Sequence, residues 1–169
     1  HMILFSESYP PSRRITRDML SSYGITHSMV SIHDHSALKE IILKNKVKLI
    51  FFESPTNPVT KIADIEFITE IARKNNVITV LDNTFAGFHN HGQCDIDIFI
   101  HSLTKYASGH SDVMGGAIIG DGKEIETVEK NFKDAIFLQT MEITNDDGVS
   151  YKMIVEYKNN KHEIRLNSY

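Results

Sequence analysis

The stretch Val77–Thr84, VITVLDNT, runs from an apolar segment directly into three polar residues. A short apolar run bounded by polar residues is typical of a strand that is covered on both faces of a sheet. Val47–Phe52, VKLIFF, has the same character and leads into the polar segment Glu53–Pro58, ESPTNP. We predict that both runs are buried strands, each ending in a polar segment.

Amphipathic patterns separate these predicted strands. Asp34 and Asp64 are each placed to cap a helix that follows. The apolar stripes of the two helices are Leu38, Ile41 and Ile42 in the first and Ile65, Ile68, Ile71 and Ala72 in the second. A further helix is predicted over Ser12–Tyr23, and further strands over Ser28–Ile32, Ile96–Ile100 and Met114–Ile119. Strands that alternate with helices predict an α/β fold with a mostly parallel sheet and helices on both faces.

Polar groups follow three of the predicted strands. They are Glu53–Pro58, Asp82–Thr84 and His101–Lys105. In open parallel sheets, ligands bind beyond the carboxyl ends of the strands. We therefore expect these three segments to converge on one ligand site.

The residue types in these segments suit pyridoxal phosphate (PLP), which needs an amine, an acid for its ring nitrogen and donors for its phosphate. Lys105 is the candidate amine and Asp82 the candidate acid, at the end of a buried strand. In an extended S-x-T-K segment, the hydroxyls of Ser102 and Thr104 would face one side and Lys105 the other. Taken singly, Asp82 also fits a strand-end cap and Lys105 a solvated charge, so the combination matters.

Together the motifs resemble those of the trans-sulfuration (Cys/Met metabolism) family of PLP-dependent enzymes. They stand here as ESPTNP at Glu53–Pro58, LDNTFA at Leu81–Ala86 and HSLTKYASGHSDVMGG at His101–Gly116. The segment Ser8–Ile25, SYPPSRRITRDMLSSYGI, is similar to the part of cystathionine β-lyases that carries a ring-stacking tyrosine. The resemblance covers about residues 6–135 and implies part of the large domain of a fold-type I PLP transferase.

The resemblance also implies roles for individual residues, with pyridoxal 5'-phosphate as the cofactor. Lys105 would form the imine with the cofactor and later move protons, and Asp82 would pair with the pyridine nitrogen. Tyr9 would lie over the ring and act as a second catalytic group. The remaining cofactor-binding candidates are Ser102 and Thr104 for the phosphate, Asn57 for the phenolic oxygen or the substrate carboxylate, and Thr84 behind Asp82.

The sequence departs from the family pattern in several places. The upstream glycine-containing phosphate loop, an upstream tyrosine-arginine pair and the C-terminal domain with its substrate-binding arginine have no counterpart here. We therefore expect residues 1–138 to form a partial PLP-binding core and residues 139–169 a divergent tail. Val149–Leu166 predicts a β-hairpin that turns at Asn159-Asn160. A replacement ending, readthrough of a broken gene and a small docking element all remain open for this tail.

The charge and hydropathy of the sequence argue against some classes of binding partner. The chain has 169 residues and a formal net charge of −4, without a basic cluster that would favour nucleic acid or an anionic membrane. No apolar run approaches the ~20 residues of a transmembrane helix. Cys94 is the single cysteine, which fits a reducing compartment, so we expect a cytoplasmic protein. His89 and His91 lack the spacing of a zinc-binding helix, and no metal is predicted.

The leading functional hypothesis is a PLP-dependent carbon–sulfur lyase, seen in truncated form. It would cleave cystathionine by β-elimination to homocysteine, pyruvate and ammonia. The alternatives are γ-lyase or γ-synthase chemistry, an inactive PLP-domain remnant, and one part of a split enzyme. The expected partners are a small sulfur amino acid and a second copy of the chain or a complementing chain.

Overall fold

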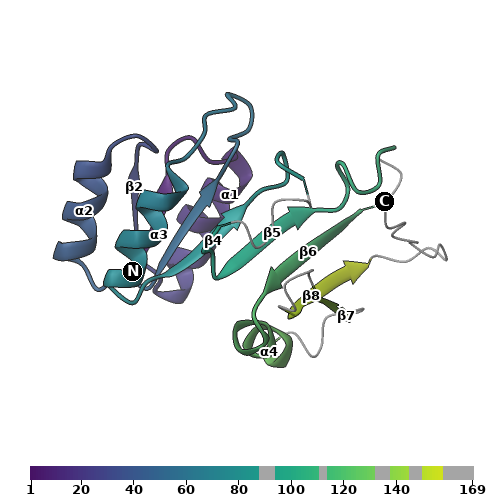
Figure 1. Cartoon of the computed structure of the whole chain (residues 1–169). Coiled ribbons are helices and arrows are strands. Elements are labelled where there is room, and N and C mark those ends of the chain that lie inside the picture. The colour runs from purple at the N-terminus through teal and green to yellow at the C-terminus, as the bar shows by residue number, and fades with distance from the viewer. Residues whose placement is uncertain (88–93, 111–113, 132–137, 145–149, 158–169) are drawn as a thin grey trace.

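The computed structural model describes residues 1–87, 94–110, 114–131, 138–144 and 150–157 (Figure 1). In the described part of the chain the strands form one eight-stranded sheet in the order β2-β1-β3-β4-β5-β6-β8-β7. The strands are β1 (Met2–Phe5), β2 (His27–Val30), β3 (Leu49–Glu53), β4 (Ile78–Asp82), β5 (Ile98–Ser102), β6 (Gly115–Gly120), β7 (Leu138–Thr144) and β8 (Ser150–Tyr157).

The helical elements are α1 (Pro10–Arg14), the π-helix η1 (Ile15–Met19), the 3₁₀-helix η2 (Leu20–Tyr23), α2 (His35–Lys44), α3 (Ile65–Lys74) and α4 (Gly122–Asn131). The helix predicted over Ser12–Tyr23 is present, but it changes type twice along its length. Hydroxyl groups bond to its backbone carbonyls, as from Thr16 to Ser12 and from Ser21 to Arg17. Such bonds compete with the regular helical ladder. Gly24, at a φ of +77°, then ends the segment.

Strands β2, β1, β3, β4 and β5 are all paired in parallel. The chain moves outward from β1 to β2 through α1, η1 and η2, then back across the sheet to β3 and β4 through α2 and α3. Right-handed crossovers place helices that move in opposite directions on opposite faces. Figure 1 shows this arrangement, with α3 in front of the sheet and α1 behind it. The predicted mostly parallel sheet with helices on both faces is confirmed.

Helices α2 and α3 begin at the predicted caps and pack side by side. The Asp34 carboxylate accepts from the Ala37 N–H at 2.9 Å, and the Asp64 carboxylate accepts from the Phe67 N–H at 3.1 Å. The ring of His35 stacks on Phe67 with centroids 3.9 Å apart. The core beneath the two helices includes the buried side chains Leu38, Ile42, Ile50, Phe52, Ile68, Ala72 and Leu81. This packing fixes the strands whose ends carry the site.

Beyond β5 the sheet becomes antiparallel, a direction that the sequence patterns did not specify. Strand β6 pairs antiparallel with β5, β8 with β6, and β7 with β8. The predicted hairpin of Val149–Leu166 is wrong in position, because β8 is the second arm of a hairpin whose first arm is β7. The Asn159-Asn160 pair lies outside the described residues. The edge of β6 offers unpaired backbone groups, and β8 bonds to them. The strand at 150–157 is therefore part of the same sheet as the rest of the chain.

Candidate active site

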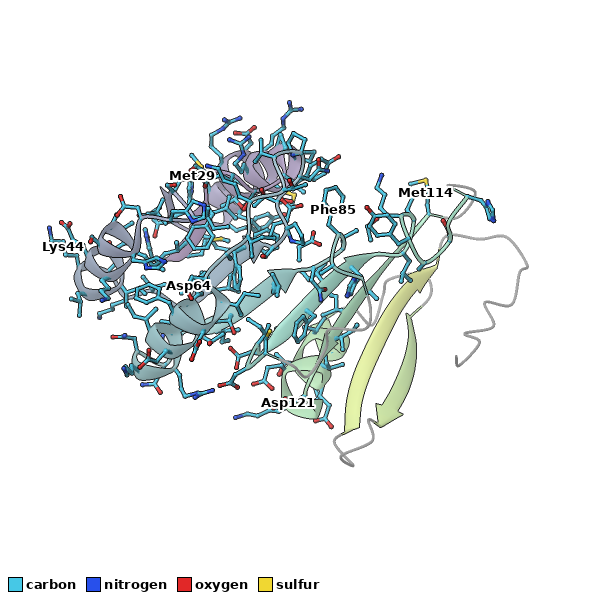
Figure 2. All side chains as sticks on the ribbon, turned by 45° about the horizontal axis from the view of Figure 1, so that its top comes forward. Met29, Lys44, Asp64, Phe85, Met114 and Asp121 are labelled. Atoms are coloured by element: carbon cyan, nitrogen blue, oxygen red, sulfur yellow. The ribbon has the colours of Figure 1, made fainter. Side chains whose placement is uncertain are left out.

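The carboxyl ends of β3, β4 and β5 lie next to one another. Glu53 is paired with Asp82, and Asp82 with Ile100. The chain leaving each strand bonds back to its neighbour, as in the Asn83 N–H donating to the Ile100 carbonyl at 3.2 Å. Figure 2 shows Phe85 and Met114 at this edge of the sheet and Asp121 at the opposite end. The three polar segments therefore follow neighbouring strands at one edge of the sheet, as expected, and their role as one ligand site stays a prediction.

Thr84 links the candidate acid to the candidate phosphate ligand. Its hydroxyl donates to Asp82 Oδ1 at 2.6 Å, and its own N–H donates to the same oxygen at 3.0 Å. The Thr84 hydroxyl also accepts from the Ser102 N–H at 2.9 Å. Asp82 and Ser102 stand on neighbouring strands, so this series of bonds fixes one relative to the other. Within the described residues, Asp82 Oδ2 and the Ser102 hydroxyl have no hydrogen-bond partner and remain available to a ligand.

The segment that carries Lys105 is a turn, and the extended geometry predicted for S-x-T-K is wrong. The Leu103 and Thr104 N–H groups both donate to the Gly115 carbonyl, at 2.9 and 3.4 Å. The Lys105 N–H then donates to the Ser102 carbonyl at 3.2 Å. Gly115 on the antiparallel strand β6 therefore draws the chain away from the line of β5. Lys105 is exposed at the tip of this turn.

Thr104 is less available to a ligand than Ser102. Its hydroxyl accepts from the Gly115 N–H at 3.0 Å and lies 3.4 Å from the Gly115 carbonyl. Sequence reasoning gave the two hydroxyls the same role. In the structure, the Thr104 hydroxyl instead joins the lysine turn to Gly115 on β6. Ser102 is therefore the better candidate for donating to a phosphate.

The backbones of Tyr9 and Asn57 are both hydrogen-bonded to Glu53 at the end of β3. Sequence reasoning gave Glu53 no role. Glu53 Oε2 accepts from the Tyr9 N–H at 2.9 Å and from the Asn57 N–H at 3.2 Å. The Tyr9 side chain is 43% exposed, which leaves its ring free to contact a ligand. Burial raises the pKa of Glu53, and the negative charge of Asp82 acts in the same direction, while the two N–H bonds oppose the shift. The signal in the sequence was an acidic residue at the end of an apolar strand.

Glu7 is a second carboxylate that sequence reasoning missed. It accepts from the Ile32 N–H at 3.0 Å, from the hydroxyls of Ser31 and Ser6, and from Lys61 Nζ at 2.9 Å. Burial raises the pKa of Glu7, but the bonds from Lys61, Ile32, Ser31 and Ser6 outweigh burial and lower it to about 2. Glu7 thus joins the ends of β1 and β2 to the loop that follows Asn57.

The donor set fits pyridoxal phosphate. Asp82 presents a free carboxylate oxygen that can hold a protonated ring nitrogen. Ser102 presents a free hydroxyl for a phosphate, and Lys105 an exposed amine that can reach an aldehyde. Tyr9 adds an exposed aromatic ring that can stack on a flat heterocycle. These four side chains come from three separate segments of the chain and supply the types of group that this cofactor requires.

The described residues offer neither a metal-binding cluster nor a membrane-spanning helix. There, no group of three or more His, Cys, Asp or Glu side chains is arranged to hold a metal ion. His89 and His91, considered above for a metal, fall outside those residues. No helix in the described part of the chain is both long and apolar enough to pass through a bilayer.

The sequence is similar to those of several known enzymes. Residues 1–147 match the family described as Cys/Met metabolism PLP-dependent enzyme. A probable cystathionine gamma-synthase of Herpetosiphon aurantiacus is 36% identical over 127 residues, which is 74% of this chain and 40% of the relative. A cystathionine beta-lyase of Coxiella burnetii is 37% identical over 140 residues, 80% of this chain and 36% of the relative.

Solved structures agree with these matches. The crystal structure of metB from Corynebacterium glutamicum has a TM-score of 0.73 and 30% identity, over 80% of this chain and 36% of that one. Cystathionine gamma-lyase from Lactobacillus plantarum, complexed with L-serine, has a TM-score of 0.71 and 29% identity. The chain thus spans less than half the length of the relatives it matches. Its sequence, its fold and the donor set at the ends of β3 to β5 place it in the Cys/Met metabolism family of PLP-dependent enzymes.

Proposed function

We propose that this chain is the PLP-binding part of a carbon–sulfur lyase that cleaves cystathionine-like amino acids by β-elimination. The observation that carries the proposal is the hydrogen-bonded series Asp82–Thr84–Ser102 beside the Lys105 turn. This series aligns an acid, a hydroxyl donor and an amine at one edge of the sheet. The C–S lyase assignment also draws on the names of the relatives, which include cystathionine lyases and synthases.

Each side chain has a role that follows from its chemistry. Pyridoxal phosphate, when bound, supplies an electron sink that makes the α-proton of an amino acid acidic. Asp82 Oδ2 would hold the ring nitrogen in its protonated form, and the Ser102 hydroxyl would donate to the phosphate. Lys105 Nζ would hold the cofactor and would act as the base that takes the α-proton of the substrate. The Tyr9 ring would stack on the cofactor, and its phenol would assist proton transfer. Asn57 orients the cofactor oxygen or the substrate carboxylate, and Thr104 braces the lysine turn.

The choice of β- over γ-elimination rests on the segment Ser8–Ile25, which is similar to that of cystathionine β-lyases. γ-Elimination by the same site is the alternative chemistry, because relatives of nearly equal identity are named cystathionine gamma-lyase and gamma-synthase. The products separate the two reactions, since β-elimination releases homocysteine and γ-elimination releases cysteine.

A second candidate is that the chain acts only in association, with a second copy or with a complementing chain. It spans 33–40% of the length of the relatives named here. Large apolar side chains are exposed on the α1–η2 segment and on β2, namely Ile15, Met19, Tyr23 and Met29. Exposed apolar side chains of this kind favour association. An inactive remnant that still associates is the remaining form of this candidate.

The test is to incubate the purified, PLP-supplemented chain with cystathionine and to identify every product. β-Lyase activity predicts homocysteine, pyruvate and ammonia in equal amounts. Cysteine with 2-oxobutyrate and ammonia would move the assignment to γ-elimination. No product from a chain that holds PLP would favour the second candidate, and the assay is then repeated with chains that co-purify at native expression levels.

A further inference from the structure

Glu53 stands at the end of β3, among the site residues, and the mechanism proposed above gives it no part. It is 7% exposed, and its strand partner Asp82 is the acid of the site. A buried carboxylate needs hydrogen bonds to offset the loss of water. Within the described residues, the side chain of Glu53 accepts two bonds, both from the backbones of candidate site residues, Tyr9 and Asn57.

The backbone of Tyr9 is held on both sides. Its N–H donates to Glu53, and its carbonyl accepts from the Arg13 N–H at 3.2 Å in the first turn of α1. Tyr9 is 43% exposed, so packing alone does not fix its ring. The position of the ring therefore depends on how firmly the backbone of Tyr9 is anchored.

Asn57 is anchored in a comparable way. Its loop closes through the buried Thr56, whose hydroxyl accepts from the Lys61 N–H at 2.9 Å, and through Ser54, which accepts from the Ala63 N–H at 3.1 Å. These bonds shape the loop, but they do not join it to the segment that carries Tyr9. The Asn57 N–H donating to Glu53 makes that connection at the backbone of Tyr9 itself, and the ion pair of Lys61 with Glu7 joins the same loop to the chain two residues earlier.

We propose that Glu53 is a positioning residue, whose single oxygen Oε2 ties the backbone of Tyr9 to that of Asn57 and so sets both side chains over the cofactor position. The inference rests on the proposed function in one respect, namely that Tyr9 and Asn57 contact the cofactor. The tie, meaning the pair of hydrogen bonds from the Tyr9 and Asn57 N–H groups to Glu53 Oε2, is present in the protein without ligand. A carboxylate that served only to close the end of β3 would affect stability without affecting the cofactor.

The first test measures the tie directly, by NMR of the ¹⁵N-labelled chain without PLP. The amide shifts of Tyr9 and Asn57 are expected to change together with pH, at one midpoint above the ordinary glutamate value. Burial of Glu53 and its charged neighbour Asp82 both move its pKa in that direction. The shared step should vanish in Glu53→Gln. Two amides that titrate independently would overturn the tie, whatever the cofactor does.

The second test asks whether the tie places the cofactor. Glu53→Ala removes the shared acceptor, and we expect PLP to bind about tenfold more weakly. Glu53→Gln keeps an acceptor oxygen, and its dissociation constant should stay within about threefold of the wild type. Asp97→Ala is the matched control, because Asp97 also accepts two bonds through one oxygen, from the N–H and hydroxyl of Thr79. Its PLP affinity should not change.

The outcomes separate the two proposals. Unchanged PLP affinity in Glu53→Ala, with faster amide exchange at Tyr9 and Asn57, would reduce Glu53 to a structural role and overturn its part in positioning. A wild-type chain that binds no PLP would instead count against the proposed function. In that case a coupled amide titration would still support the tie.

Discussion

At the amino ends of β4 and β5, Asp97 uses one carboxylate oxygen to accept from the Thr79 N–H and hydroxyl, both at 2.7 Å. At the carboxyl ends of the same strands, Asp82 uses Oδ1 to accept from the Thr84 N–H and hydroxyl, at 3.0 and 2.6 Å. The two motifs are alike, but their surroundings differ. Asp82 is paired with Glu53 on β3 and is linked through Thr84 to Ser102, whereas Asp97 is bonded to Thr79 on β4. The same local bonding therefore serves the fold at one end and, in our proposal, prepares a ligand site at the other.

The amino end also carries a hollow of about 220 Å³, lined by residues that include Arg73, Asn76, Asp95 and Asp97. None of the candidate site residues lines it. A hollow alone does not identify a ligand site. In this one, the two acidic side chains are already paired, Asp97 with Thr79 and Asp95 with Arg73. The contrast between the two ends can be tested by mutation.

The largest effect is expected from Asp82→Ala. It removes the charge that pairs with the ring nitrogen, and a charge-assisted hydrogen bond contributes about 1.5–3 kcal/mol. We expect PLP to bind roughly 10- to 100-fold more weakly, as measured by titration of the cofactor absorbance. Asp97→Ala should bind PLP as the wild type does. Equal losses in the two variants would remove the distinction between the ends.

Thr84→Val should have the next largest effect. The substitution keeps the shape of the side chain but deletes the hydroxyl that donates to Asp82 and accepts from Ser102. We expect PLP affinity to fall about tenfold, since two site residues lose their connection while the Thr84 N–H still holds Asp82. Thr84→Ser restores the hydroxyl and should restore the affinity. A valine variant with full affinity would mean that the series of bonds is not needed.

How far the sequence predicted this site depends on the distance that each contact spans along the chain. The caps at Asp34 and Asp64 and the link from Thr84 to Asp82 are local, and simple patterns indicated all of them. The bond from Tyr9 to Glu53 spans 44 positions and those from Ile32 and Lys61 to Glu7 span 25 and 54, so no local pattern could reveal them.

The errors in the fold have related causes. Apolar periodicity identified β6 as a strand, but it carries no information on strand direction. The lysine turn was predicted as extended because its shape depends on Gly115, ten residues further along, which accepts from Leu103 and Thr104. β1 was missed because its apolar run, MILF, is only four residues long, although all four positions are buried. The hairpin was misplaced because an Asn-Asn turn signal does not outweigh pairing with the open edge of β6.

At the amino end, Asp97→Ala should lower the free energy of unfolding by about 1–2 kcal/mol, because Thr79 loses the acceptor of its N–H and hydroxyl. Urea denaturation measures this loss. Asp97→Asn keeps one acceptor oxygen and should lose less. An Asp97→Ala variant as stable as the wild type would show that this motif does not support the fold.

The smallest effect is expected from Glu7, a carboxylate at the carboxyl end that serves the fold. Its pKa of about 2 lies below the ordinary value of 4.5. The stability that it contributes is therefore complete above about pH 4.5 and is lost as pH falls toward 2. Glu7→Gln should cost about 1 kcal/mol at neutral pH and less in acid. NMR titration of the Glu7 carboxyl carbon checks the pKa, and a midpoint near 4.5 would contradict the assignment.

The central claim is that the carboxyl ends of β3 to β5 hold pyridoxal phosphate with Lys105 as its point of attachment. The most direct test is to add PLP to the purified chain, reduce with borohydride and locate the modified residue by peptide mass spectrometry. We predict stoichiometric phosphopyridoxyl label on Lys105, with Lys105→Ala losing it and Asp97→Ala retaining it. Label scattered over surface lysines, or equal labelling of Lys105→Ala, would contradict the account.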